Sequence, residues 1–355
     1  MSEAEILYEM RGPVALITLN RPRALNAITH AMVLSLERQL DLWRDDPAVQ
    51  AVVIRGAGER AFCAGGDIRV LWEAGRPGGE RGRANFRFYA DEYRMNTRIK
   101  RFPKPYIALM DGIVMGGGVG VSIHGALRVA TERTLFAMPE TGIGLFPDVG
   151  GTWFLPRLPG EVGMWLGLTG ARLRAEDTLR AGICDAFIAA ERLPALIDHL
   201  ATEADWALAR RDLRAALAGA GLAWEAAGDL DHLAEIDALF AGASVEEILD
   251  ALAAGGTEWA MKHREIILAK SPTSTRIAFR QIRTGRHLDF EDCMRLEFRL
   301  ARFCMTHPDF YEGVRAVIID KDNAPRWQPA TLAEATEEFV APAFAPLPEG
   351  EELRL

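Results

Sequence analysis

The sequence predicts an α/β fold, in which strands alternate with helices, followed by a helical C-terminal region. Over about the first 190 residues, short β-branched and apolar runs typical of buried strands are separated by stretches with apolar residues at helical spacing. Beyond residue 200 the composition shifts to alanine, leucine and glutamate, which favour helices. We therefore expect a core domain over residues 1–200 and a helical region over residues 201–355.

Four strands and one long helix are expected in the N-terminal part. The helix begins after Thr29, a residue type that caps helix N-termini, and Asp46-Pro47 ends it. Its apolar residues, from Val33 to Trp43, recur at helical spacing. The strands are predicted at Val14–Leu19, Ala51–Ile54, Tyr106–Met110 and Arg128–Ala130.

The C-terminal region carries helix signals of its own. Residues 244–247, Ser-Val-Glu-Glu, fit a capping box that opens a helix. Ser271-Pro272 interrupts the helical pattern of residues 258–306. From Pro325 the chain is rich in proline, alanine and glutamate, and we expect this last segment to wrap the surface.

Composition and charge exclude several classes of protein. With 49% hydrophobic and 26% charged residues, the chain is not a disordered one. A net charge of −9 argues against a nucleic-acid binder, which would show a basic domain. No apolar run approaches the roughly 18 residues that a membrane-spanning helix needs. We therefore expect no nucleic-acid partner and no membrane partner.

The cysteines and histidines show no metal or disulfide pattern. The four cysteines form no CxxC pair, and the histidines form no HExxH motif. The first five residues lack the apolar segment of a signal peptide and the arginine-rich pattern of a transit peptide. We expect no bound metal and a cytoplasmic location.

Glycine is in excess, and the excess is clustered. The chain has 33 glycines among 355 residues, about 9%, whereas the usual share is ~7%. One cluster, Gly65-Gly66, and a second, Gly116–Gly120, each come soon after a predicted strand. Two such loops could each aim one backbone N–H at a single oxygen, which would make an oxyanion hole. The alternative is two tight turns in which only glycine fits.

Other glycine motifs do not fit. The chain has no GxxxxGK[ST] run, which excludes a P-loop. The dinucleotide-binding pattern GxGxxG fails because Val121 occupies the third glycine position. The nucleophile motif GxSxG fails at His124, so Ser122 and His124 are interpreted as ordinary helix residues.

Two carboxylates lie eight residues apart in an apolar segment. Glu140 and Asp148 stand among apolar residues, glycines and prolines over residues 136–151. An acid in apolar surroundings has a raised pKa, which suits proton transfer near neutral pH. The alternative is that Glu140 caps a helix and Asp148 holds a turn or caps a helix before Gly150-Gly151.

In combination these segments resemble the crotonase (enoyl-CoA hydratase/isomerase) superfamily. The resemblance implies a crotonase-like ββα spiral core with a helical C-terminal extension. The segments that carry it, in this order along the chain, are Asn20–Ala27, Phe62–Ile68, Gly112–Gly120 and Pro139-Glu140.

Within this superfamily the chain is similar to the 3-hydroxyisobutyryl-CoA hydrolase family over nearly its whole length. The matching stretches are residues 63–69, 115–120, 138–151, 310–316 and 319–322. This resemblance implies an acyl-CoA thioester hydrolase that acts on a branched short-chain β-hydroxyacyl-CoA from valine catabolism. It implies no metal or redox cofactor. Coenzyme A is part of the substrate and is not counted as a cofactor.

The resemblance also assigns roles to particular residues. Glu140 and Asp148 fall on the family's catalytic acids, and the N–H groups of Gly66 and Gly117 fall on its oxyanion hole. Glu92 falls on a position that contacts the substrate, although by itself it would be interpreted as an exposed helix residue. The positions that hold the adenosine and pantetheine parts of coenzyme A, largely through the backbone, are Ala24, Leu25, Ala27, Ala64, Asp67 and Ile68.

Gly120 is the main departure from the hydratase pattern. Hydratases of the superfamily carry a second catalytic glutamate at this position, so the two-glutamate addition of water to a double bond loses one partner. Asp148 meanwhile stands where hydratases usually have glycine. The second acid of the catalytic pair thus stands at position 148 instead of position 120, which favours hydrolysis on the same fold.

Two alternatives remain open from the sequence. Dienoyl-CoA isomerases of the superfamily also carry a glutamate and an aspartate eight residues apart, although Glu92 and residues 312–315 favour the hydrolase. A non-catalytic scaffold or RNA-binding member is a second alternative, which the acidic charge disfavours. Superfamily members commonly form trimers, so a homo-oligomer is one expectation. Whether Glu140 attacks the thioester or activates water is also left open.

Overall fold

The computed structural model describes residues 4–75 and 83–355, which form two compact units. The first unit comprises Met1–Gly66, Arg94–Phe136 and Arg172–Leu230, and the second comprises Asp67–Tyr93, Ala137–Ala171 and Asp231–Leu355. Residues 1–3, the start of the N-terminal segment considered above, lie outside the described residues. Each unit is thus assembled from segments that are far apart in the sequence.

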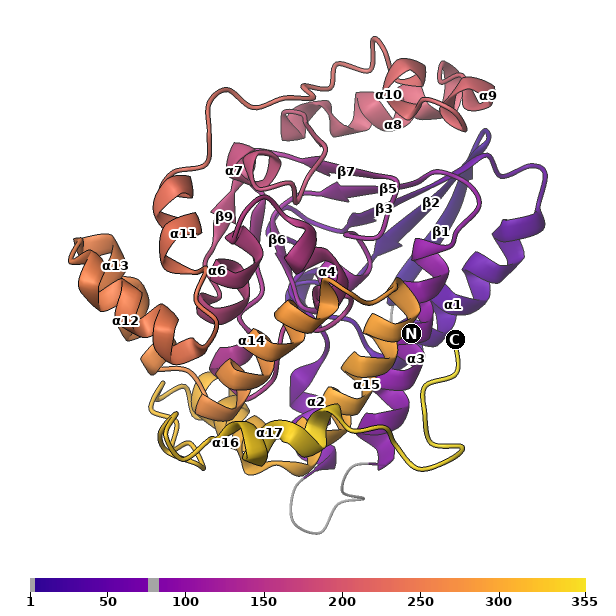
Figure 1. Cartoon of the computed structure of the whole chain (residues 1–355). Helices are drawn as coiled ribbons and strands as arrows, with labels where there is room; N and C mark the ends of the chain where they lie inside the picture. The colour runs from indigo at the N-terminus through magenta and orange to yellow at the C-terminus, as the bar shows by residue number, and fades with distance from the viewer. Residues whose placement is uncertain (1–3, 76–82) are drawn as a thin grey trace. The chain divides into compact units, whose positions relative to one another are not determined.

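A six-stranded sheet forms the centre of the first unit, with strand order β1-β2-β3-β5-β7-β10 (Figure 1). β1 is antiparallel to β2, and the other neighbouring strands are parallel. The strands are β1 (Ile6–Arg11), β2 (Val14–Leu19), β3 (Ala51–Gly56), β5 (Tyr106–Met110), β7 (Leu127–Ala130) and β10 (Ala186–Phe187).

One face of this sheet is covered by three short helices of the same unit. Alternate residues of the strands, such as Val14 and Leu16 of β2, point to this face because the side-chain period of a strand is two. They share one buried cluster with Leu196, Leu200 and Trp206. The helices, drawn in pink in Figure 1, are α8 (Leu193–Thr202), α9 (Trp206–Ala209) and α10 (Leu213–Ala216).

A smaller sheet and several helices complete the first unit. This sheet has the order β4-β6-β8-β9, with β4 parallel to β6 and β8 antiparallel to β9. The hydroxyl of Thr29 caps α1 by accepting the N–H of Met32 at 3.2 Å. The elements are β4 (Ala61–Cys63), β6 (Ile113–Met115), β8 (Leu135–Ala137), β9 (Leu173–Arg174), α1 (His30–Asp45), α4 (Gly117–Gly120), α7 (Ala175–Arg180), η1 (Pro22–Ala24) and η4 (Ala190–Arg192).

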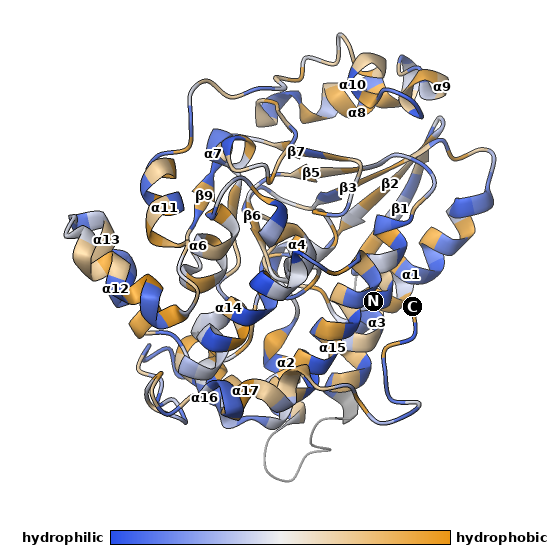
Figure 2. Cartoon of the chain, in the orientation of Figure 1, coloured by the Kyte–Doolittle hydropathy of each residue, from blue (hydrophilic) through white to orange (hydrophobic). Residues whose placement is uncertain are grey.

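The second unit is helical. α14 packs against α5, α6 and α17, and α15 packs against α5, α16 and α17. Figure 2 shows both hydrophilic and hydrophobic residues along α14 and α15, as expected for helices with one buried face. Its elements are α2 (Ile68–Ala74), α5 (Gly151–Phe154), α6 (Val162–Thr169), α11 (Leu233–Leu239), α12 (Val245–Gly255), α13 (Glu258–Leu268), α14 (Pro272–Gly285), α15 (Phe290–Thr306), α16 (Pro308–Val314), α17 (Glu337–Phe344), η2 (Glu140–Ile143), η3 (Leu155–Arg157) and the π-helical turn η5 (Arg315–Ile319).

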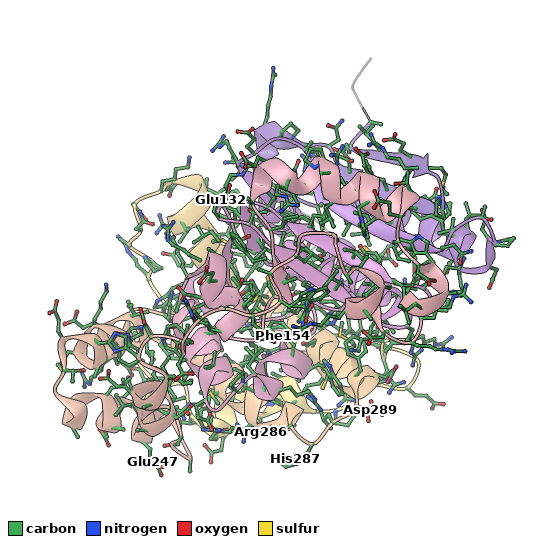
Figure 3. The ribbon with its side chains drawn as sticks, turned by 90° about the horizontal axis from the view of Figure 1, so that it is seen from above. Glu132, Phe154, Glu247, Arg286, His287 and Asp289 are labelled. Atoms are coloured by element: carbon green, nitrogen blue, oxygen red, sulfur yellow. The ribbon has the colours of Figure 1, made fainter. Side chains whose placement is uncertain are left out.

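Side-chain caps begin the longer helices of the second unit. Ser244 caps α12 by accepting the N–H of Glu247 at 3.1 Å, and Ser271 caps α14 by accepting that of Ser274. Asp289 caps α15 by accepting the N–H of Asp292 at 2.8 Å. Arg286, His287 and Asp289 lie in the short connection between α14 and α15 (Figure 3). This connection fixes where α15 begins, and therefore which of its residues face inward.

The observed elements confirm the four predicted strands, the helix after Thr29 and the helix that opens at Ser244. The segment from Pro325 differs from expectation in one respect, because it contains the helix α17. The two units also divide the chain differently from the boundary expected near residue 200. Residues 193–216 pack on the sheet of the first unit because their apolar faces complete its core.

Helix α3 (Arg83–Lys100) contributes residues to both units, up to Tyr93 to the second and from Arg94 to the first. Among the described residues, no helix is long and apolar enough to cross a membrane. Within the same residues, no group of three or more His, Cys, Asp or Glu side chains could hold a metal ion.

Candidate active site

The two glycine clusters follow neighbouring strands of the small sheet in the first unit. β4 and β6 are parallel, so Gly66 and Gly117 come after the carboxyl ends of adjacent strands. A Cβ atom at Gly118 would lie 2.2 Å from the carbonyl oxygen of Cys63, so this position admits only glycine. The two clusters therefore lie side by side.

The backbone of these loops adopts conformations that favour glycine. Gly65 has a φ of +120° and Gly116 a φ of +47°. Gly117 is the first residue of α4, so its N–H belongs to the turn that has no acceptor within the helix. This geometry suits the donor role predicted for Gly117. A tight turn without any catalytic role would have the same geometry, so the oxyanion role stays a prediction.

The loop of residues 24–27 is joined to the first glycine cluster. The N–H of Ala64 donates to the carbonyl of Leu25 at 3.0 Å, and the N–H of Ile28 donates to that of Gly65 at 2.8 Å. Leu25 and Asn26 both have positive φ, at 52° and 56°. The structure thus brings together the predicted binding positions Ala24, Leu25, Ala27 and Ala64.

Asn26 is the side chain that secures this loop, and no local pattern in the sequence marks it for this role. It is fully buried, and its Nδ2 donates to the carbonyls of Ala57 and Ala61 at 3.0 and 2.8 Å. Its Oδ1 accepts the N–H of Arg21 at 2.9 Å. These bonds tie the turn to the carbonyls on either side of the segment 58–60 and to its own first residue.

Asp67 and Ile68, the remaining predicted binding positions, belong to the second unit. Asp67 is the N-cap residue of α2, and Ile68 is its first helical residue. Asp67 makes no side-chain cap hydrogen bond.

The predicted acids gather in the second unit with one face of α3. Glu92 and Asp148 are 2% and 4% exposed, so the interpretation of Glu92 as an exposed helix residue is wrong. The hydroxyl of Tyr93 donates to Oδ2 of Asp148 at 2.9 Å. Tyr89, one helical turn before Tyr93, is also buried and packs against it with ring centroids 5.8 Å apart. α3 thus brings a carboxyl and two phenols to the loop that carries Asp148.

Asp148 stands on a turn rather than at a helix cap. α5 begins at Gly151, and its N-cap residue is Gly150, which has a φ of 95°. The alternative in which Asp148 caps this helix is therefore wrong, and its carboxylate is bound by Tyr93 instead. Gln281 of α14 donates to the carbonyl of Pro147 at 2.5 Å, which holds the turn from its other side.

Burial shifts the pKa values of these acids upward. It raises the pKa of Asp148 to about 7, although the hydrogen bond from Tyr93 acts in the opposite direction. Burial, together with the charges of Asp148 and Glu297, raises the pKa of Glu92 well above its usual value. Asp148 therefore titrates in the range where proton transfer is effective.

Glu140 opens the 3-10 helix η2 and is 4% exposed. Burial, and then the charge of Asp148, raise the pKa of Glu140 well above its usual value, while the Lys270 ammonium acts in the opposite direction. Within the described residues, Oε2 of Glu140 and Oε1 of Glu92 are buried without a hydrogen-bond partner. They can accept hydrogen bonds from a polar ligand.

The distant C-terminal segment supports η2 directly. A Cβ atom at Gly313 of α16 would lie 2.5 Å from the carbonyl carbon of Ile143, and one at Gly144 would lie 2.2 Å from the backbone of Asp309. Close approach of the two helices is thus possible because both contact positions are glycine. The segment that matched the hydrolase family downstream therefore packs on the element that carries Glu140.

Three residues of this region were not found from the sequence: Tyr93, Gln281 and Glu297. Tyr93 lies four residues after Tyr89, and this helical spacing was a signal for a shared face. Gln281 and Glu297 stand in helical stretches whose neighbours are ordinary amphipathic residues, so no local pattern marks them.

The chain belongs to the enoyl-CoA hydratase/isomerase family. The model of this family, described as "Enoyl-CoA hydratase/isomerase", matches residues 14–344. Among solved structures, the chain is similar to a carnitinyl-CoA dehydratase from Mycobacterium thermoresistibile, with a TM-score of 0.90, 38% identity and 99% of each chain covered. It is also similar to an enoyl-CoA hydratase from Rhodobacter sphaeroides 2.4.1, with a TM-score of 0.88, 38% identity and coverage of 99% and 100%. These similarities confirm the predicted crotonase-like α/β fold.

Curated relatives of similar length are named 3-hydroxyisobutyryl-CoA hydrolase, mitochondrial. The relative from Danio rerio is 46% identical over 359 residues, which covers 98% of this chain and 91% of the relative. The relative from Homo sapiens is 43% identical and covers 97% and 89%. These names place the relatives in mitochondria and so do not support the cytoplasmic location expected for this chain.

Proposed function

We propose that this chain hydrolyses a short-chain β-hydroxyacyl-CoA thioester, with 3-hydroxyisobutyryl-CoA as its substrate and 3-hydroxyisobutyrate and coenzyme A as products. The observation that carries the proposal is the buried pair Glu140 and Asp148 in a chain that has glycine at position 120. The relatives named 3-hydroxyisobutyryl-CoA hydrolase, similar over almost the full chain, support it.

In the proposed reaction, the thioester oxygen accepts hydrogen bonds from the N–H groups of Gly66 and Gly117. One such donor is typically worth about 3–4 kcal/mol of barrier, because negative charge develops on that oxygen. The amide donors act without any proton transfer, so their contribution does not depend on pH.

The carboxyl groups supply the proton transfers. An ionised Glu140 takes a proton from water, which attacks the thioester carbon, or attacks that carbon itself to give a mixed anhydride that water then hydrolyses. In both routes the carbon–sulfur bond breaks and the thiolate of coenzyme A leaves. Asp148, with a pKa of about 7, can protonate that thiolate, and in this proposal Oε1 of Glu92, which has no partner among the described residues, accepts a hydrogen bond from the substrate hydroxyl.

Release of free thiol tests the proposal. We expect the protein to liberate coenzyme A from 3-hydroxyisobutyryl-CoA, read with a thiol reagent, and from 3-hydroxypropionyl-CoA in a panel of short acyl-CoAs. Boiled protein and the G117P variant, which lacks the amide donor, are the controls. Absence of thiol release from every acyl-CoA in the panel would exclude the proposed hydrolysis.

Hydration or isomerisation of an enoyl-CoA is the second candidate function. It is favoured by the two solved structures at 38% identity, which are named as a carnitinyl-CoA dehydratase and an enoyl-CoA hydratase. The same protein is therefore assayed for loss of the enoyl thioester absorbance and for dienoyl isomerisation. Either activity without thiol release would reverse the order of the two candidates.

Cofactor need, assembly and cellular location belong to the same proposal. We infer that the reaction needs no metal or redox cofactor, so dialysis against EDTA should leave thiol release unchanged. A cytoplasmic location and a homo-oligomer remain predictions. No disulfide bond joins the four buried cysteines, which suits a reducing compartment.

A further inference from the structure

Glu297 is a buried carboxylate that binds the backbone just after Asp148. It lies in the middle of α15 and is 0% exposed. Its Oε2 accepts the N–H of Gly150 and its Oε1 accepts the N–H of Thr152, both at 2.8 Å. Each oxygen thus holds one end of the segment that follows Asp148, and all three residues belong to the second unit.

The segment that Glu297 holds is conformationally strained. Val149 has a φ of 52° and Gly150 a φ of 95°. A β-branched residue in the left-handed region costs on the order of 1–3 kcal/mol and persists only where the surroundings enforce it. The observed turn therefore needs an external constraint.

Glu297 provides the N-terminal cap that α5 lacks in its own sequence. Gly150, the N-cap residue of α5, has no side chain that could accept the first N–H groups of the helix. The carboxylate of Glu297 accepts two of them from another helix, 147 and 145 residues further along the chain.

An apolar residue would fill this position in α15 at lower energetic cost. The inward face of the helix is otherwise made of residues such as Met294, Leu300 and Ala301. Burial raises the pKa of Glu297 to about 8, and the N–H of Gly150 acts in the opposite direction. A carboxyl group that is so expensive to ionise, beside other acids, indicates a role beyond packing.

We propose that Glu297 is a positioning residue for the reaction: it clamps the turn of Val149 and Gly150 so that Asp148 is presented to the hydroxyl of Tyr93. This inference rests on the proposed thioesterase function. Glu297 acts through the backbone of the turn, whereas Asp148 acts on the substrate.

Glu297 belongs to the electrostatic surroundings of Asp148. The titratable groups that face Asp148 are, from α3, Tyr89, Glu92 and Tyr93, from η2, Glu140, and from α15, Glu297 and Cys304. The pKa of Asp148 is about 7, whereas burial, and then the charge of Asp148, raise the pKa of Glu297 to about 8. Asp148 therefore ionises first, and loss of Glu297 acts on Asp148 through the geometry of the turn.

Two variants test this role. Glu297→Gln keeps the length of the side chain but replaces one acceptor with an amide donor. We expect kcat for thiol release to fall on the order of tenfold to a hundredfold with KM changed less than threefold, because Asp148 is no longer held in position. Glu297→Asp keeps both acceptor oxygens but is too short to reach both N–H groups, so kcat should fall in this variant as well.

Hydrogen exchange tests the clamp independently of the reaction. The amides of Gly150 and Thr152 should exchange faster in both variants than in the unsubstituted protein. Glu161→Gln is the matched control, because Glu161 pairs with Arg283 and Arg286 in the same unit and makes no bond to the turn. It should leave the exchange of the two amides and kcat unchanged.

Two outcomes would overturn the inference. If Glu297→Gln lowers only the melting temperature, with kcat unchanged, then Glu297 is a structural residue. If the two amides exchange as before in both variants, then the clamp does not exist. Failure of the unsubstituted protein to release thiol refutes the proposed function instead, and the exchange experiment still decides whether Glu297 holds the turn.

Discussion

At the scale of single residues, the chemistry of this protein depends on how the surroundings of four carboxyl groups change their pKa values. Glu92, Glu140, Asp148 and Glu297 are each at most 4% exposed, and burial raises the pKa of each. Their contacts differ, and these contacts divide their roles. Asp148 has a hydrogen bond from a phenol, Glu297 has two from the backbone, and Glu92 and Glu140 each keep one oxygen without a partner among the described residues.

Conservative removal of either predicted catalytic acid should abolish most of the turnover. Glu140→Gln and Asp148→Asn keep shape and polarity but cannot accept or donate the protons that the reaction needs. We expect each to lower kcat for thiol release by at least about a hundredfold, the usual contribution of a positioned acid or base. Circular dichroism should show an unchanged fold, and near-normal rates would refute the assignments.

Replacement of Tyr93 should shift a pKa rather than abolish activity. In Tyr93→Phe, Asp148 loses the hydrogen bond that favours its charged form, so its pKa rises above about 7. The limb of the kcat–pH profile that Asp148 controls should move to higher pH. Tyr106→Phe, a buried phenol in the first unit, is the control and should leave the profile in place. A profile that does not move would show that Asp148 does not control it.

At the scale of elements, short helices carry the site residues, and longer ones hold them in place. η2, which carries Glu140, is four residues long, and such a helix has little stability of its own. It is held by α16 through close glycine contacts and by the N–H of Ser271, which donates to the carbonyl of Thr141 at 3.1 Å. The hydroxyl of Ser271 in turn donates to Asp309 of α16 at 2.6 Å.

A methyl group at the contact of α16 with η2 should destabilise the protein. In Gly313→Ala the new Cβ would lie 2.5 Å from the carbonyl carbon of Ile143, so one of the two helices must move. We expect a loss of about 1–3 kcal/mol in urea unfolding, typical of overpacking, together with lower kcat. Gly255→Ala is the control, because its Cβ would lie 3.4 Å from Leu239, an ordinary contact, and alanine favours the helix. Equal stability of the two variants would contradict the packing argument.

At the scale of the whole molecule, each compact unit collects segments from distant parts of the chain. The first unit binds the loop of residues 24–27 to the glycine cluster at Ala64–Gly66, and the second gathers the acids from three separate segments. Groups that a local pattern would place in different elements therefore become neighbours within one unit.

The buried carboxyl groups should make the protein more stable in mild acid than in mild base. Their folded-state pKa values, about 7 for Asp148 and about 8 for Glu297, exceed the unfolded values near 4, so the native state holds more protons between these limits. Their stabilising contribution is full below the unfolded pKa and is lost as the pH rises through 7 and 8. The free energy of unfolding in urea should fall from pH 6.5 to pH 8.5.

The variant Glu297→Gln provides the check on this pH dependence, because it removes one of the groups. Its stability should fall less steeply over the same interval. His263 and His307, whose pKa values are lowered by burial, act in the opposite direction but titrate below pH 6.5. A stability that rises from pH 6.5 to pH 8.5 would show that the carboxyl groups are not protonated in the folded protein.

Much of the fold followed from local patterns. The strand Val14–Leu19 and the helix cap at Thr29 were visible because strand burial and helix capping depend on residues within a few positions of each other. The glycines at 65, 66 and 116–118 marked turns for the same reason. The sequence by itself thus determined four of the strands, the helices that Thr29 and Ser244 cap, the two glycine loops and the two candidate acids.

Only the tertiary structure decided which of these groups meet. Tyr93 and Asp148 are 55 residues apart and Gly150 and Glu297 are 147 apart, and no periodicity links such pairs. Tertiary packing also overrode the local interpretation of Glu92 as exposed and of Asp148 as a helix cap. The physical reason is that burial, and with it the pKa of an acid, is set by neighbours that the fold brings from elsewhere in the chain.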